Sequence, residues 1–233
     1  MDVIGDLVAR ERRVKEPLVY GDGSQPYTAY KFCTDAWKAA SLFRYHGVGP
    51  GRAVAVAADP TPQSLLAFFG AALLGAPVRL GLPPEADARV VVGPVAAVES
   101  LTVDPGTKRV GYGDEPSDPD VIHFERDIWS ENPTMPPDRV RPDQPALSTA
   151  DETYTHEALL AAAERVVDER DLADGDAVAV RASLTRPGTL VAGVLAPLQV
   201  GASILLAETG PEPTLVVGAE GDAPTLDPDG VVL

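Results

Sequence analysis

The sequence predicts an α/β fold made of two related βαβ-type halves, each a mainly parallel sheet with helices packed against it. Three observations predict it: a long internal repeat, short β-branched segments of strand length, and helical apolar patterns between those segments. The chain has 233 residues, 45% of them apolar, which is enough to form a substantial core.

The repeat is visible in two places along the chain. Residues 48–56 (Val-Gly-Pro-Gly-Arg-Ala-Val-Ala-Val) return at 172–180 as Leu-Ala-Asp-Gly-Asp-Ala-Val-Ala-Val. Residues 73–80 (Leu-Leu-Gly-Ala-Pro-Val-Arg-Leu) likewise return at 199–206 as Gln-Val-Gly-Ala-Ser-Ile-Leu-Leu. Gly51 then corresponds to Gly175 and Gly75 to Gly201, offsets of 124 and 126 residues. Two matches in order at nearly one offset indicate a duplicated unit.

Each copy is expected to open with a helix, at 29–46 and at 155–170. Apolar residues recur there at helical spacing. They are Tyr30, Cys33, Trp37 and Ala40 in the first copy, and Leu159, Ala162, Ala163 and Val166 in the second. Gly47 and Gly49 are expected to end the first helix, because a residue without Cβ can turn left-handed.

A buried strand follows in each copy, at 53–57 and 177–180. A second helix then starts near Pro62 or Pro187, since proline is tolerated in the first turn. Gly75 and Gly201 cap these helices, and a further apolar strand comes next. Strand, helix and parallel strand form the right-handed crossover unit.

Further segments complete the expected organisation. Residues 89–93 and 108–112 read as strands, 114–143 as a Pro- and Asp-rich surface crossing, and 214–218 as the counterpart of 90–93. The chain then ends in a polar tail. We therefore divide it into a first α/β half at 1–143, with the repeat unit 27–93, and a second half at 144–233, with the repeat unit 154–218.

The uncharged stretch 189–207 has the length of a membrane span. It is interrupted by Gly193, Pro197 and Gly201 and ends in a strand-like Ser-Ile-Leu-Leu. A buried helix followed by a buried strand explains it better, so we expect no membrane association.

Charge narrows the expected environment and partners. The net charge is −16 and lysine occurs at only four positions, with most basic charge on arginine. Nucleic acid and anionic membranes would repel such a chain. The composition suits the cytoplasm of a salt-accumulating, haloarchaeal microbe; the alternative is an ordinary acidic protein from a GC-rich genome. The single Cys33 and an N-terminus without an apolar signal core also fit the cytoplasm.

The order of these segments resembles the N-terminal part of adenylate-forming enzymes, the acyl-CoA synthetase superfamily. The resemblance covers almost the whole chain. It is carried by the hairpin at 17–28, the Gly-Val-Gly-Pro-Gly turn at 47–51, the Gly-Ala-Pro-Val segment at 75–78 and the Leu-Ala-Pro-Leu helix with its Gly-Ala end at 195–202. The family is likewise built from two internally related sheet halves, and typical members are more than twice this length.

The family's phosphate loop is the main departure. That loop is a Ser-, Thr- and Gly-rich run ending in Pro-Lys-Gly. Here 145–149 resembles the segment before the loop and 155–160 the segment after it, with only Ala-Asp-Glu-Thr-Tyr between them. The glycines and the lysine are absent, and Asp151 and Glu152 bring negative charge. Ser148, Thr149 and Thr153 mark the degenerate phosphate position.

Other motifs are also missing or weak. Ser-Leu-Thr-Arg at 183–186 replaces the family's aromatic-His element, and the adenine motif, hinge and lid lie beyond this sequence. His46, His123 and His156 lack metal-ligand spacing, and we expect His156 to start a helix. Residues 125–127 read as a surface loop or a helix start, and Cys33 as a small core residue. No metal and no catalytic residue is expected.

Two functional hypotheses follow. In the first, the chain is a degenerate, non-catalytic acyl-CoA synthetase-like pseudoenzyme that acts as a binding or regulatory partner of a protein, of a second copy of itself or of a small acyl or nucleotide-like ligand; no cofactor is then expected. In the second, it is an AMP-forming ligase-type enzyme with an altered nucleotide site or completed by another chain, using ATP and Mg²⁺. A drifting fragment without selected function is the remaining interpretation.

Overall fold

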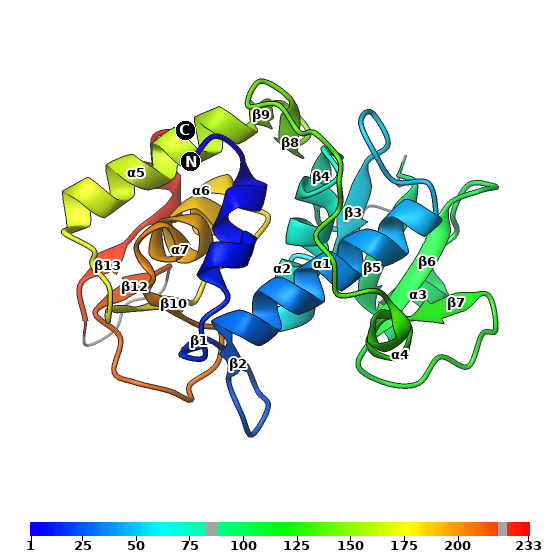
Figure 1. Ribbon diagram of the computed structural model, residues 1–233, viewed down its shortest axis with the longest axis horizontal. Helices are drawn as coiled ribbons and strands as arrows, with labels where there is room; N and C mark the ends of the chain where they lie inside the picture. The colour runs from blue at the N-terminus through cyan, green and yellow to red at the C-terminus, as the bar shows by residue number, and fades with distance from the viewer. Residues whose placement is uncertain (83–87, 219–222) are drawn as a thin grey trace.

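The computed structural model describes residues 1–82, 88–218 and 223–233, and it contains two mixed sheets with helices between them (Figure 1). The first is a seven-stranded sheet in the order β7-β6-β5-β3-β4-β8-β9. All its neighbouring strands are parallel except the hairpin β8–β9. Its strands are β3 (Val54–Val56), β4 (Val78–Leu80), β5 (Val90–Pro94), β6 (Lys108–Tyr112), β7 (Val121–His123), β8 (Pro145–Ser148) and β9 (Thr153–Thr155).

The second is a six-stranded sheet in the order β13-β12-β10-β11-β1-β2. It is parallel throughout except for the hairpin β1–β2. Its strands are β1 (Pro17–Tyr20), β2 (Tyr27–Thr28), β10 (Ala177–Val180), β11 (Ser203–Leu205), β12 (Leu215–Val217) and β13 (Thr225–Leu226).

The duplication predicted from the sequence is confirmed in the strand register. Val54 lies opposite Val78 and Val90 in the first sheet, and Val178 lies opposite Ile204 and Leu215 in the second. The parallel crossovers β3–α2–β4 and β10–α6/α7–β11 are therefore the same unit repeated, and the predicted α/β fold class is confirmed.

Each sheet receives a hairpin from the other repeat. The hairpin β1–β2, which precedes the first repeat's helix, pairs through Val19 with Ile204 of β11. The hairpin β8–β9, which precedes the second repeat's helix, pairs through Leu147 with Val78 of β4. Each sheet therefore includes strands from both sides of the boundary expected at 143/144, and that boundary stays a prediction.

Helices α1, α2 and α7 lie between the two sheets (Figure 1). One continuous apolar core joins them to one face of each sheet. The helices are α1 (Ala29–Tyr45), α2 (Pro62–Ala72), α3 (Val95–Ser100), α4 (Phe124–Ser130), α5 (His156–Arg170), α6 (Pro187–Leu190) and α7 (Ala196–Val200), with a π-helical segment (Val191–Leu195) between the last two. Short 3-10 helices occupy Ile4–Val8, Arg10–Arg12 and Pro228–Gly230.

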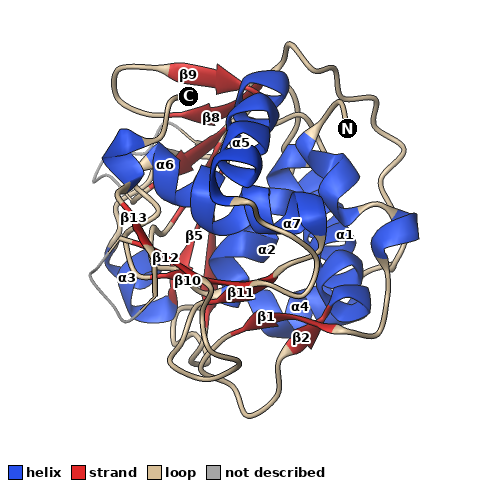
Figure 2. Cartoon of the chain, turned by 90° about the vertical axis from the view of Figure 1, so that its left-hand side faces the viewer, coloured by secondary structure: helices blue, strands red, loops and turns tan. Residues whose placement is uncertain are grey.

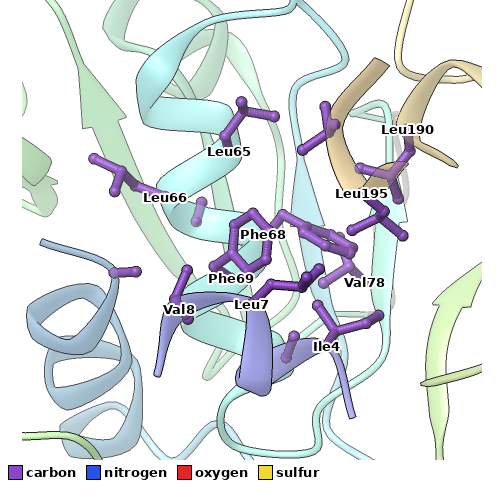
Figure 3. Packing of buried hydrophobic residues seen from close by; sticks show 14 of the residues in the cluster. Ile4, Leu7, Val8, Leu65, Leu66, Phe68, Phe69, Val78, Leu190 and Leu195 are labelled. Carbon is purple, nitrogen blue, oxygen red and sulfur yellow. The ribbon is translucent and has the colours of Figure 1, made fainter. Parts of the chain in front are cut away.

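Helix α2 is the centre of this core. Every residue from Ser64 to Ala72 is buried, and Gly70 sits so close to α1 that a Cβ there would lie 2.9 Å from the Cβ of Ala39. Ile4, Leu7 and Val8 of the N-terminal segment close one side of α2, next to Phe68 and Phe69 (Figure 3). The N-terminal residues are thus part of the core, which joins the two halves into one structure.

The helices begin and end at local sequence features. Thr28, Thr61 and Thr155 cap α1, α2 and α5 by accepting a hydrogen bond from a backbone N–H three residues ahead. Gly75 and Gly201 have φ of 64° and 85°, the left-handed values expected after a helix. The uncharged stretch 189–207 is a buried helix followed by a strand, and no helix in the described part of the chain is long and apolar enough to cross a membrane.

Four details of the sequence interpretation are wrong. Tyr30 is half exposed instead of facing the core, and Gly47 (φ 81°) makes the left-handed turn without Gly49. The segment 114–143 contains strand β7 and helix α4, whose Phe124 is fully buried. The polar tail forms β13 and buries Leu226. In the last two segments, apolar residues that pack into the core are surrounded in the sequence by charged residues and prolines, which hid the pattern.

Candidate functional site

The turn of the β8–β9 hairpin is the candidate site, because it occupies the position of the predicted degenerate phosphate loop. Strand β8 is held by the buried Ala146 and Leu147 and by its parallel pairing with β4. Ser148 therefore comes at the carboxyl end of β8, at the edge of the sheet where α/β proteins bind their ligands. Figure 2 shows this hairpin at the edge of the molecule opposite to the hairpin β1–β2.

The turn is closed by Thr149. The Oγ1 atom of Thr149 accepts hydrogen bonds from the backbone N–H groups of Glu152 (3.0 Å) and Asp151 (3.3 Å). The backbone N–H of Thr149 in turn donates to the carbonyl of Glu152 at 2.8 Å. These backbone donors are the groups that would cradle an anion in an open loop, and here they are engaged within the turn.

The structure brings the three predicted residues together. Ser148 Oγ and Thr153 Oγ1 lie 3.3 Å apart across the hairpin, next to Thr149. Their hydroxyls form a small polar end to the sheet. The exposed Asp151 and Glu152 stand at the tip of the same turn.

These residues do not fit a nucleotide phosphate. The turn has no glycine to allow close backbone approach, its N–H groups are hydrogen-bonded internally, and its two carboxylates repel a polyanion. Residues 145–156 also contain no lysine or arginine. The geometry of the turn therefore agrees with the charge argument made from the sequence.

Tyr154 reinforces the closed turn. Its hydroxyl donates a hydrogen bond to the Glu152 carboxylate, and this bond raises the pKa of Tyr154 to about 12. The phenol is thus neutral at ordinary pH and holds the acidic side chain against the hairpin.

His156 starts α5, as predicted, and is fully buried. Its Nδ1 accepts a hydrogen bond from the backbone N–H of Ile4 at 3.2 Å, so this histidine ties the N-terminal segment to α5. Burial lowers the pKa of His156 to about 4, which keeps the ring neutral. Its Nε2 has no hydrogen-bond partner among the described residues. Its role in the structure is to pack and to anchor Ile4.

The carboxyl edge of the six-stranded sheet is filled by Arg181 and Arg186, of which the sequence interpretation named only Arg186, as the end of the Ser-Leu-Thr-Arg run. Arg181 follows β10 directly and donates to the carbonyls of Val180, Leu205 and Ala207 at 3.0 to 3.1 Å. It also pairs with Glu208 at 3.2 Å. The sequence feature that could have identified Arg181 is its position immediately after a buried strand.

Arg186 fastens the C-terminal segment to the same edge. It donates to Asp227 at 2.5 Å and to Asp229 at 2.8 Å, and this contact lowers the pKa of Asp229. The Ser-Leu-Thr-Arg run at 183–186 thus works as an internal clamp. The two carboxyl edges meet nearby, where the backbone N–H of Leu184 donates to the carbonyl of Ala58 at 3.0 Å.

The remaining candidate chemistry is structural. Cys33 is buried in the core, and burial raises the pKa of its thiol to about 11, so the reactive thiolate is suppressed. Across residues 1–82, 88–218 and 223–233, no three His, Cys, Asp or Glu side chains are grouped so as to hold a metal ion. Residues 125–127 lie in helix α4, as one of the two expectations had it.

Solved structures with a similar fold are adenylate-forming ligases and related domains. The anthranilate CoA ligase AuaEII in complex with anthranoyl-AMP aligns with a TM-score of 0.79 at 17% identity, over 93% of this chain and 49% of that one. A benzoate CoA ligase from Burkholderia xenovorans LB400 gives 0.76 at 22% identity, over 94% of this chain and 50% of the other. The N-terminal domain of FACL13 from Mycobacterium tuberculosis gives 0.70 at 18%, over 88% and 57%.

These comparisons establish the fold. The chain spans about half the length of the two ligases, 49% and 50%, and it matches the N-terminal domain of FACL13. No family model and no curated protein matches the sequence. The expected likeness to the N-terminal domain of acyl-CoA synthetases is thus confirmed at the level of three-dimensional structure.

Proposed function

We propose that this protein is a non-catalytic relative of the adenylate-forming enzymes that acts as a binding or regulatory partner. The similarity of its fold to aryl- and acyl-CoA ligases supports the kinship. The observation that carries the loss of catalysis is the closed turn at Thr149, whose hydroxyl occupies the N–H groups of Asp151 and Glu152.

Two further features support the same conclusion. Arg181 and Arg186 are bound to the chain's own carbonyls and carboxylates, so the edge of the six-stranded sheet is already occupied by internal contacts. The carboxylates of Asp151 and Glu152 also oppose a phosphate chain. Binding in this proposal is directed to a protein, a second copy or a small acyl or nucleotide-like ligand, with no ATP turnover.

ATP–pyrophosphate exchange tests the loss of catalysis. The full chain is assayed in KCl of about 1 M with Mg²⁺, ATP and a panel of aromatic and aliphatic carboxylic acids, because screening at that ionic strength reproduces a salt-rich cytoplasm. A benzoate CoA ligase serves as the positive control. We expect no exchange above the level without protein. If the protein catalyses exchange and the variant Thr149→Ala alters its rate, the proposal is wrong and a ligase with an altered nucleotide site is favoured.

The partner role is tested separately by sedimentation velocity of the purified chain over a range of concentrations. Concentration-dependent dimerisation would support a second copy as the partner. A monomer throughout would direct the proposal to a different protein or a small ligand.

We also propose that the acidic composition, −16 at neutral pH, is an adaptation to a salt-rich cytoplasm. The free energy of unfolding should then rise with KCl up to the molar range, because salt screens the mutual repulsion of the carboxylates. A free energy that is flat or falls with KCl would contradict this part.

A further inference from the structure

A hollow of about 500 Å³ opens at the amino edge of the seven-stranded sheet, and the proposed function does not involve it. It lies where β3, β4, β5 and β6 begin, at the opposite edge of that sheet from the Thr149–Glu152 turn. Its size falls in the range of small-molecule sites.

Three arginines line this hollow in a strongly acidic chain. They are Arg52, Arg79 and Arg89, and Asp104 is the single carboxylate among the described residues around it. The chain as a whole carries 35 acidic and 19 basic residues, whereas arginines outnumber carboxylates in the described lining of this hollow. Such a local reversal favours an anionic ligand.

Arg89 is held in place by backbone carbonyls. Its Nε donates to the carbonyl of His46 at 2.6 Å and its Nη1 to the carbonyl of Gly106 at 2.7 Å. Arg52 donates from Nη1 to the carbonyl of Gly47 at 3.2 Å. Within the described part of the chain, neither side chain forms an ion pair with a carboxylate. These hydrogen bonds thus fix the direction of both guanidinium groups.

The two guanidinium groups lie close together at the end of α1. The position of a Cβ on Gly47 would be 3.3 Å from Arg52 Nη1 and 3.2 Å from Arg89 Nε. Like charges held this near each other repel, and an anion between them would relieve the repulsion. The pKa of His46, next to Gly47, is lowered by burial and then by the positive charges of Lys108 and Arg89.

The equivalent edge of the six-stranded sheet lacks this character. By the offset of the repeat, Asp176 stands where Arg52 does, and Thr214 stands where Arg89 does. Asp174 adds a second carboxylate there. The fold alone therefore does not require arginines at this edge, which points to a role specific to the first half.

We propose that this hollow binds the phosphate chain of a small di- or triphosphate. Guanidinium groups match phosphate oxygens with paired, charge-assisted hydrogen bonds. Gly51 and Gly106, with φ of 72° and 100°, border the site and leave it open to a bulky anion. The proposal is independent of the proposed function, because the two sites lie at opposite edges of the sheet.

Calorimetric titration of the full chain with inorganic tripolyphosphate, without Mg²⁺, tests this site. We expect saturable binding of one ion per chain, stronger in about 0.2 M than in about 1 M KCl because salt screens the contact. Arg52→Gln should weaken binding roughly tenfold, since one charge-assisted contact is lost. Arg170→Gln makes the same change in charge on α5 and should leave the affinity within about twofold.

A second variant guards against misfolding of the first. Asp104→Asn removes the carboxylate found in the described lining of the hollow, and it should tighten binding by roughly threefold or more. A parallel titration with ADP shows whether a nucleoside contributes: equal affinity assigns recognition to the phosphate chain alone, and tighter binding assigns it to a nucleotide. The proposal is overturned if no saturable binding occurs at the lower salt, or if Arg52→Gln and Arg170→Gln weaken binding equally.

Discussion

The hairpins β1–β2 and β8–β9 occupy the same position in the two repeats, yet they end in different turns. The first runs through the loop 21–26 and pairs with β11, and the second closes in the shorter turn 149–152 and pairs with β4. Their pairing, their following capped helices and their registers are alike. The backbone pattern is thus preserved across the duplication, while the loops and edges differ in chemistry.

The amino and carboxyl edges of the two sheets show the same contrast between a similar backbone and different side-chain chemistry. Arginines gather at the amino edge of the first sheet, and aspartates stand at the equivalent positions of the second. At the carboxyl edge of the second sheet, Arg181 and Arg186 hold the chain to itself. Each difference between the halves can be tested by changing one copy and leaving its counterpart as the control.

The largest effect is expected at the starts of the helices that follow β3 and β10. Gly188 follows Pro187 as Gln63 follows Pro62, but a Cβ on Gly188 would lie 2.0 Å from the carbonyl oxygen of Pro228. Gly188→Ala should therefore lower the free energy of unfolding by about 3 kcal/mol, because the backbone of the tail must move. Denaturant unfolding in KCl measures it.

Gln63→Ala is the matched control in the other repeat. It removes one hydrogen bond to Glu125 at 3.0 Å and should cost about 1 kcal/mol or less. Equal losses for the two variants would mean that the tail does not pack on α6 as the structure has it.

The next effect concerns the first residues of α1 and α5, which are Ala29 and His156. His156 has a pKa of about 4 in the folded chain, against about 6.5 when unfolded. The unfolded chain therefore binds more protons between these values, and stability falls as the pH is lowered through that window. From pH 7 to pH 5 the expected loss from this residue is about 2 kcal/mol.

His156→Gln should remove most of this pH dependence, since the amide does not titrate and its oxygen can still accept from Ile4. Unfolding free energies of both proteins at the two pH values give the difference directly. An identical slope for wild type and variant would show that folding does not lower the pKa of His156.

The smallest effect is expected at the turn of the second hairpin. Thr149→Ala removes the acceptor for the backbone N–H groups of Asp151 and Glu152, and it should cost about 1 kcal/mol. Ser24→Ala in the loop of the first hairpin is the control. Hydrogen exchange of the amides of Asp151 and Glu152 should accelerate only in the Thr149 variant; unchanged exchange would mean that Thr149 does not close the turn.

Much of the fold could be predicted from the sequence because its signals are local. Strand β10 is a run of buried Ala and Val, Thr155 caps α5, and Gly201 supplies the left-handed turn after α7. The exchange of hairpins could not be predicted, because alternation along β1 or β8 does not specify which sheet the strand joins. The choice is made by long-range pairing, such as Val19 with Ile204.

The position of the candidate site could be predicted from its residue composition, but the closed conformation of its turn could not. The missing glycines and the acidic Asp151 and Glu152 are visible in the sequence, but the role of Thr149 as acceptor for both N–H groups depends on the turn conformation. The arginine hollow shows the same limit. Arg52 and Arg89 are far apart in sequence, and only the sheet brings both to the end of α1.

The most direct test of the closed turn is a titration of ¹⁵N-labelled protein with ATP and Mg²⁺ in KCl of about 1 M, followed at individual amides. We expect the signals of Thr149, Asp151 and Glu152 to stay unchanged, even if ATP shifts amides around the arginine hollow. Saturable shifts at Asp151 and Glu152 would show that nucleotide reaches the turn and would contradict the non-catalytic interpretation.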